Sequence, residues 1–182
     1  MVDRRVNRTK RLIKEAFIDL IAEQSLHTIM VSEVAERADV GRSTFYKYYD
    51  NVGDLFEQLS DGLIDDLVVI MIKDLEDHLE FDPERLMHKV INYVEENSRV
   101  LTLFIREGDH FVQDMKQTFC NELIESQHIA SDDYNRRMRI AFTVDAVVDI
   151  LARWQLSSEK KAAYLVEQGI VSVLDKIYGS KV

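Results

Sequence analysis

Loop-forming and cross-linking residues are scarce in this chain of 182 residues, which contains six Gly, one Pro and one Cys. A loop-rich all-β fold is disfavoured, because tight turns usually need Gly or Pro. Cys120 stands alone, so neither an intrachain disulfide nor a multi-cysteine metal cluster can form, and a reducing compartment fits best. The hydrophobic fraction of 46% excludes a wholly disordered chain.

Long hydrophobic runs are also missing. The longest, Leu67 to Ile72, is far shorter than the roughly 20 apolar residues that span a bilayer. The first residues are charged and lack the apolar core of a secretory signal. We therefore expect a cytoplasmic protein with no membrane partner.

Charge is distributed unevenly along the chain. The formal net charge is −10, yet residues 1–14 contain six Lys or Arg against one Asp. A short basic segment on an acidic chain is expected where one end contacts a polyanion. The alternative, a frayed and solvated basic tail, explains the asymmetry equally well.

Apolar residues recur at helical spacing along almost the whole chain, and no strand-like alternation of useful length is present. This pattern predicts an all-α fold of about nine helices, with an N-terminal three-helix domain over residues 1–53 and a C-terminal helical domain over 54–182. The predicted helices span residues 9–24, 31–38, 42–48, 51–79, 83–96, 98–106, 111–123, 132–154 and 158–178.

The last two predicted helices, 132–154 and 158–178, are apolar around much of their circumference. A helix of that kind must be covered on more than one side. Two such helices from each of two subunits would form a four-helix interface about a two-fold axis, which predicts a homodimer. The alternative is that the other helices of the same chain cover them.

Residues 28–55 predict two short helices separated by about four residues, the geometry of a helix-turn-helix. Val34, Ala35, Ala38, Phe45 and Tyr49 can pack on the preceding helix. Cations, hydroxyls and an aromatic ring are left pointing outward on the second short helix. Such a set suits phosphate contacts and base-edge contacts in a major groove. The outward residues are Arg42, Ser43, Tyr46 and Lys47.

This segment resembles the DNA-binding domain of the TetR family of transcriptional regulators over about residues 9–55. Eleven residues match the family's pattern in register: Val31, Val34, Ala35, Ala38, Val40, Thr44, Phe45, Tyr46, Tyr48, Tyr49 and Leu55. The resemblance implies contacts to double-stranded DNA, with Arg42 and Ser43 as base readers and Tyr46, Lys47 and Tyr48 on phosphates. It also places Thr28, Gly41 and Thr44 at the DNA. The N-terminal Arg4, Arg5 and Arg8 could extend these contacts as a basic arm.

Four positions depart from the family's pattern. Met30 replaces a Thr that caps the first motif helix, and Thr28 is a candidate substitute. Asp39 replaces the turn glycine, and Asp tolerates a left-handed backbone better than most residues. Gly41 replaces a Ser or Thr N-cap, and Val52 replaces a Lys that meets the DNA backbone. We expect weaker non-specific DNA binding as a result.

An effector pocket among the helices after residue 54 is the second implication of the resemblance. Its filling by a small molecule would move the helix that begins near residue 51 and displace the two recognition helices. Candidate lining residues are Met87, Tyr93, Phe104, His110, Phe111 and Met115, although each is also a plausible core residue.

Enzyme chemistry finds no support in the sequence. No nucleophile elbow, phosphate-binding glycine loop or zinc spacing is present, so we predict no catalytic residue, cofactor or metal. Asp74 with His78 and Glu84 with His88 are spaced for metal binding, but solvated helix pairs of this kind are far more common.

The sequence as a whole predicts a TetR-like repressor that binds a near-palindromic operator as a homodimer and is released by a small-molecule effector. The alternative is a dimeric ligand- or protein-binding module whose helix-turn-helix no longer binds DNA strongly.

Overall fold

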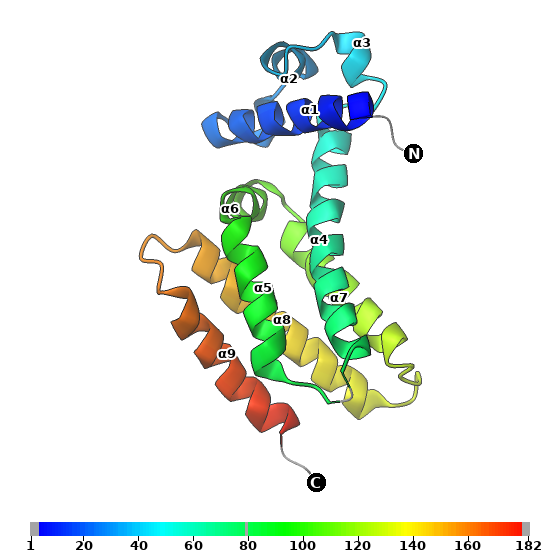
Figure 1. Cartoon of the computed structure of the whole chain (residues 1–182), viewed down its shortest axis with the longest axis vertical. Coiled ribbons are helices and arrows are strands. Elements are labelled where there is room, and N and C mark those ends of the chain that lie inside the picture. Colours follow the sequence, from blue (N-terminus) through cyan, green and yellow to red (C-terminus); the bar gives the residue numbers. More distant parts are fainter. Residues whose placement is uncertain (1–3, 79, 180–182) are drawn as a thin grey trace. The chain divides into compact units, whose positions relative to one another are not determined.

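The computed structural model describes residues 4–78 and 80–179. Over these residues the chain forms α-helices and one 3-10 helix, with no strand, so the all-α prediction is confirmed. The helices are α1 (Arg4–Glu23), η1 (Leu26–Thr28), α2 (Val31–Arg37), α3 (Arg42–Phe45), α4 (Val52–Glu76), α5 (Pro83–Glu96), α6 (Ser98–Glu107), α7 (Phe111–Ser126), α8 (Tyr134–Leu156) and α9 (Ala163–Tyr178) (Figure 1).

Five helix boundaries differ from the predicted ones by three residues or more, and two of these are the ends of α4, at Glu76 rather than 79, and of α7, at Ser126 rather than 123. Helix α1 begins at Arg4 rather than near residue 9. Helix α9 begins at Ala163 rather than 158, because the indole Nε1 of Trp154 donates to the carbonyl of Lys161 at 2.9 Å and holds the connection as a loop. Helix α3 ends at Phe45 rather than 48.

The shortness of α3 has a local cause. Its N-cap, Gly41, has no side chain to bond the first backbone N–H groups. After Phe45 the chain tightens, since the N–H of Tyr48 donates to the carbonyl of Phe45 at 2.9 Å and that of Lys47 to Thr44 at 3.3 Å. These hydrogen bonds join residues three apart, so the chain continues after α3 as tight turns of the 3-10 type.

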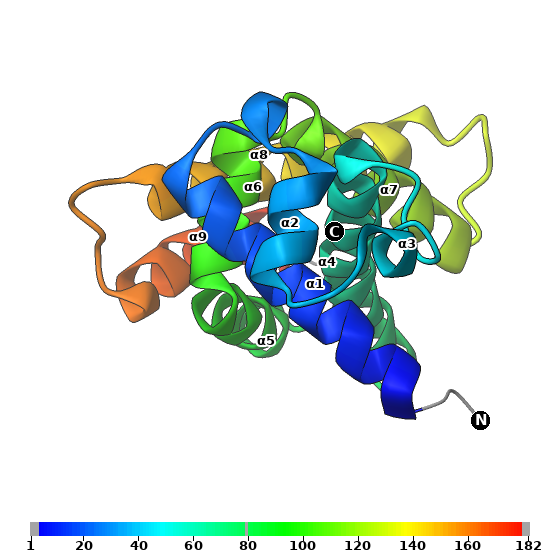
Figure 2. The same cartoon turned by 90° about the horizontal axis from the view of Figure 1, so that it is seen from above.

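The chain divides into two compact units at Gly62, within α4. In the first unit, α2 packs across α1 and α3 packs beside α2 (Figures 1 and 2). The amphipathic pattern of α1 explains this arrangement, because one face is buried in the core of the unit. That face consists of Ile13, Ala16, Phe17, Ile18, Leu20 and Ile21.

In the second unit, α5 packs against α9, and α8 packs against α6 and α7. The α5–α9 contact is formed by Leu86, Met87, Ile170 and Leu174, all buried. Helix α5 starts where the sequence predicted, because the Asp82 carboxylate accepts from the N–H groups of Glu84 and Arg85 and Pro83 occupies the first turn. Among the described helices, none combines the length and the hydropathy that crossing a bilayer would require.

Candidate nucleic-acid interface

The turn between α2 and α3 reverses the chain through a left-handed residue. Asp39 has φ 52°, the conformation that the family's glycine would adopt. The turn is closed by backbone bonds from the N–H of Asp39 to the carbonyl of Glu36 at 3.1 Å and from Val40 to Ala35 at 2.9 Å. Four residues therefore separate the two helices, as the motif requires.

Five side chains hold the two short helices on α1. They are the residues that the sequence assigned to packing, and each has at most 5% of its surface exposed: Val34, Ala35, Ala38, Phe45 and Tyr49. The rings of Phe45 and Tyr49 lie 5.5 Å apart. Burial, and then the nearby Asp54 carboxylate, raise the pKa of Tyr49, so this phenol stays neutral. The motif is thus a small packed core that leaves the opposite side of α3 exposed.

The predicted contact residues lie on the outer side of α3 and of the turn that follows it, since Tyr46 is the C-cap of α3 and Lys47 comes next. Arg42, Ser43, Tyr46 and Lys47 are exposed, and 55% of Tyr46 is open to solvent although its ring touches Phe45. Within the described part of the chain, Arg42 and Lys47 have no ion-pair partner. Both cations are therefore available to an anionic ligand.

The remaining predicted residues lie around this face. Gly41 is exposed at the start of α3, whereas Thr44 and Tyr48 are half-buried. Thr28 lies in η1, outside the two motif helices, and its hydroxyl donates to the carbonyl of Ser25 at 2.7 Å.

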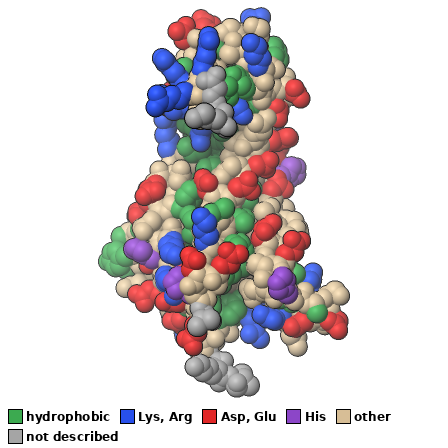
Figure 3. Space-filling view, turned by 45° about the vertical axis from the view of Figure 1, so that its right-hand side comes forward, with side chains coloured by type: hydrophobic (Ala, Val, Ile, Leu, Met, Phe, Trp, Pro, Cys, Tyr) green, Lys and Arg blue, Asp and Glu red, His purple; other side chains and the backbone are tan. Residues whose placement is uncertain are grey.

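A cation that the sequence analysis did not single out completes the site. The Nζ atom of Lys10 lies 5.8 Å from the ring centres of both Tyr48 and Tyr49. In the sequence, Lys10 was indicated only as one of the basic residues within 1–14. Arg4, Arg5 and Arg8 also belong to α1, so they form helical turns instead of an extended arm. Figure 3 shows basic side chains gathered over the first unit.

Thr28 does not cap α2, although the sequence offered it as a substitute for the Thr that Met30 replaces. Met30 provides no side-chain bond at the N-cap. Instead the Glu33 carboxylate accepts from the N–H of Met30 at 2.8 Å, which is one half of a capping box. The capping bond is therefore provided by Glu33, the third residue of the helix, and not by Thr28.

The start of α4 shows why Val52 cannot replace a phosphate-binding Lys. Val52 is buried, with 9% of its surface exposed. Asn51 caps this end of α4, since its Oδ1 accepts from the N–H of Asp54 at 3.0 Å. Bonds from Gln58 and from the N–H of Asp50 lower the pKa of Asp54. This end of α4 is thus apolar and anionic.

The six predicted effector-pocket residues fall in different surroundings of the second unit. Met87 and Met115 line a cavity of about 300 Å³ among α4 to α9, and the other four are not among its lining residues. Phe104 and Phe111 are buried and form an edge-on ring pair. Tyr93 donates to Asp66 at 3.1 Å, and burial raises its pKa, whereas His110 is exposed just before α7.

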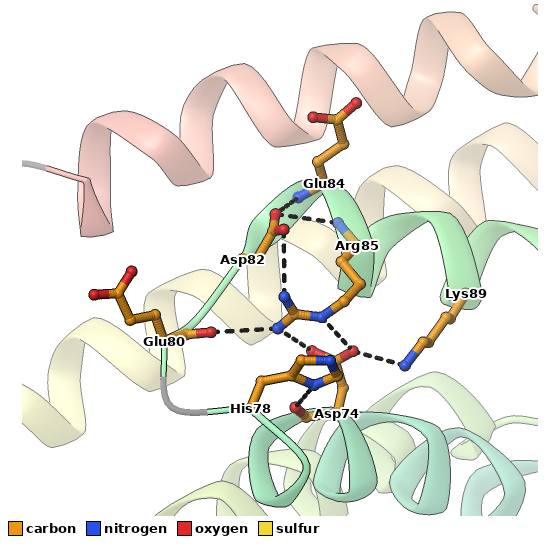
Figure 4. Close-up of polar contacts among 7 residues, drawn as sticks. All are labelled: Asp74, His78, Glu80, Asp82, Glu84, Arg85 and Lys89. Carbon is orange, nitrogen blue, oxygen red and sulfur yellow. Dashed lines mark hydrogen bonds and ion pairs between the residues drawn. The ribbon is translucent and has the colours of Figure 1, made fainter.

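The two Asp–His and Glu–His pairs spaced for metal binding include residues that contact other groups of the protein. The Asp74 carboxylate is fully buried and accepts from Arg85 at 3.0 Å and Lys89 at 2.8 Å, while His78 contacts the Asp74 backbone carbonyl (Figure 4). His88 lies 3.3 Å from Glu167, on another helix. Among the described residues, no group of three or more potential ligands is suited to a metal ion.

Comparison with known proteins agrees with the geometry of the first unit. Residues 13–59 match the family model described as bacterial regulatory proteins, tetR family. The chain is 26% identical over 127 residues to the HTH-type dhaKLM operon transcriptional activator DhaS of Lactococcus lactis subsp. lactis (strain IL1403). That match covers 68% of this chain and 65% of the relative, slightly less than two thirds of its length.

Solved structures with the same fold cover nearly the whole chain. The dihydroxyacetone kinase operon activator DhaS superposes with a TM-score of 0.68 at 19% identity, over 94% of this chain and 96% of the other. A TetR transcriptional regulator from Streptococcus agalactiae 2603V gives 0.67 at 22% identity with the same coverage. The likeness extends the shared fold beyond the segment that the family model matches.

Proposed function

We propose that this chain, whose residues 13–59 form the helix-turn-helix segment of the bacterial tetR family, is a DNA-binding transcriptional regulator. The observation that carries the proposal is the outer side of α3 and of the turn that follows it. There Arg42 and Lys47, which have no ion-pair partner among the described residues, are exposed beside Ser43 and Tyr46. A short helix of this kind fits a major groove.

Within that face we assign base contacts to Arg42 and Ser43. Arginine can bond two acceptors on a guanine edge, and a hydroxyl can bond to any base. Tyr46, Lys47 and Tyr48 are assigned to phosphates, with Lys10 supporting the tyrosine pair from α1. Thr28, Gly41 and Thr44 remain proposed contacts through their positions in the family's motif.

A homodimer would place two such helices in successive major grooves of a near-palindromic operator. Support comes from the apolar surface of α8 and α9, where large hydrophobic side chains are 37% to 69% exposed. On α8, Tyr134, Met138 and Phe142 follow one another at four-residue spacing, so each lies one turn beyond the last on the same side of the helix. The whole set is Tyr134, Met138, Phe142, Ile150 and Leu156 on α8, with Tyr164, Leu165 and Val173 on α9.

The direction of control is a separate proposal. We propose repression by an operator-bound dimer that a small-molecule effector releases. The relative in Lactococcus lactis is named as an operon activator, which supports the opposite direction. A promoter–reporter assay with and without the protein separates the two, since expression falls under a repressor and rises under an activator.

The test of DNA binding is selection of bound fragments from a genomic library at about 150 mM salt, where non-specific contacts are partly screened. The matched control is Tyr46→Ala, which removes an exposed side chain outside the packed core. We expect a near-palindromic sequence to be enriched by the native protein and lost in the variant. Absence of enrichment at this and at lower salt would overturn the proposal and favour a binding module without DNA function.

A further inference from the structure

Helix α8 borders the cavity of the second unit along most of its length. Every third or fourth residue on one side of α8 lines the cavity, from Arg136 to Gln155. Because an α-helix rises about 1.5 Å per residue, these two residues are about 28 Å apart. A volume of about 300 Å³ spread over that length describes a narrow channel, suited to an extended chain.

The middle of the channel is apolar. Between its ends α8 contributes Val144, Val147, Val148 and Leu151, and the facing helices add further aliphatic and aromatic side chains. The hydroxyls of Thr143 and Tyr178 bond to each other at 3.0 Å. An aliphatic chain would therefore be matched by its surroundings over most of the channel.

Two arginines mark one end of the channel. Arg136 and Arg139 are both exposed lining residues. Arg136 donates to the neutral Gln127 at 3.2 Å, and neither arginine has a carboxylate partner among the described residues. An anionic group bound here would keep partial contact with water, which lowers its desolvation cost.

Gln155 marks the other end and is 4% exposed. Its Oε1 accepts from Ser98 at 2.7 Å and from Lys160 at 2.8 Å, and because an ammonium group only donates, the amide orientation is fixed. Its Nε2 is buried and has no acceptor in the part of the chain that the structure describes. A buried amide N–H group without an acceptor is unfavourable, so an oxygen of a bound molecule would stabilise this end.

We propose that this channel binds an elongated aliphatic carboxylate whose far end carries an oxygen that accepts a hydrogen bond. The carboxylate lies at Arg136 and Arg139, the chain follows α8, and the far oxygen accepts from Gln155 Nε2. Its role as an effector rests on the proposed regulatory function, whereas its binding does not.

Calorimetric titration of the full chain, without DNA, tests the binding with three probes that differ in one group at a time. Monomethyl hexadecanedioate has the carboxylate and a far ester oxygen. Palmitate lacks the far oxygen, and dimethyl hexadecanedioate lacks the charge. We expect the monoester to bind about tenfold or more tightly than either of the others.

Variants assign each preference to its residue. Gln155→Glu keeps the acceptor for Lys160 but replaces the free N–H donor with an oxygen, so the monoester should lose its advantage over palmitate. Arg139→Gln should remove the difference in affinity between the monoester and the diester. Arg137→Gln, a neighbour on α8 outside the cavity lining, should change neither preference.

Equal affinity for the three probes, no binding of the monoester, or preferences unchanged by both variants would overturn the inference. Operator selection distinguishes its failure from that of the proposed function. A chain that enriches an operator but binds no probe remains a regulator with this inference refuted. A chain that binds the monoester but enriches no DNA supports the channel and refutes the regulator.

Discussion

At the scale of single residues, two positions decide how the motif is built and used. Asp39 has a left-handed conformation in the turn between α2 and α3, and Lys47, just after α3, is an exposed cation with no ion-pair partner among the described residues. The role of Asp39 depends on backbone strain, and that of Lys47 depends on electrostatics. Each can be changed without touching the buried core of the unit.

Replacing Asp39 separates backbone strain from side-chain contacts. A left-handed conformation costs an L-residue with an ordinary side chain roughly 1 to 2 kcal/mol. We expect Asp39→Ala to lower the free energy of unfolding by about 1 kcal/mol, while Asp39→Gly leaves it unchanged or raises it. Urea denaturation measures both. Equal destabilisation by the two variants would show that the Asp side chain, and not the backbone, stabilises the turn.

Replacing a residue assigned to phosphate and replacing one assigned to a base should have different effects on DNA binding. Lys47→Ala should weaken binding to all sequences and reduce the dependence of log affinity on log salt by about 1, because one phosphate contact is lost. Arg42→Ala should instead relax the preference at one or two operator positions, by about 1 to 3 kcal/mol each. Fluorescence anisotropy with native and substituted operators measures both. An unchanged consensus for Arg42→Ala would refute its role as a base reader.

At the scale of elements, the α4–α5 junction depends on a buried carboxylate. Asp74 near the end of α4 receives bonds from Arg85 and Lys89, which are one turn apart on α5 (Figure 4). Arg85 also donates to Asp82 at 3.3 Å and to the carbonyl of Glu80 at 3.3 Å. These contacts order the connection between the two helices and contribute to the stability of the second unit.

The charge on Asp74 makes stability depend on pH. Burial raises its pKa, but the bonds from Arg85 and Lys89 outweigh this effect, and the pKa lies below the ordinary 3.8. A lowered pKa stabilises the fold above that ordinary value, and the contribution is lost as the pH falls through the pKa of the folded protein. The native chain should therefore lose stability below about pH 4.

Asp74→Asn tests this expectation. At pH 7 it should lower the free energy of unfolding by about 1 to 3 kcal/mol, since Arg85 and Lys89 are partly exposed and regain water. Its melting temperature should also vary less below pH 4 than that of the native chain. Asp77→Asn, at an exposed position nearby, is the matched control and should change neither property.

At the scale of the whole molecule, the uncovered apolar surface of α8 and α9 supports a dimer in solution. Phe142 is 64% exposed within that surface. We expect Phe142→Asp to convert a dimer to a monomer with unchanged helical content, because a charge would be buried without a partner. Light scattering with size-exclusion chromatography measures the mass.

Val69→Asp is the control for the dimer test, because it changes a 47% exposed valine on α4 in the same way. It should leave the mass unchanged. A native chain that is already monomeric, or a Phe142→Asp variant that remains dimeric, would contradict the proposed interface.

Several features were determined by the sequence alone. Apolar spacing located the helices, because a helix must bury one face whatever it packs against, and Asp82-Pro83 fixed the start of α5 through local capping. The buried set of the motif, including Phe45 and Tyr49, followed from the same periodicity. Local physical rules were sufficient wherever neighbours in the chain make the interaction.

Contacts between distant residues required the tertiary structure. Three features depend on residues that packing brings together. They are the late start of α9 after the Trp154–Lys161 bond, the position of Lys10 over two tyrosine rings, and the burial of Val52. The cavity is the largest case, since its walls come from six helices and include only Met87 and Met115 of the six predicted residues. Periodicity shows which side of a helix is buried, but only packing decides whether that side faces another helix or an open channel.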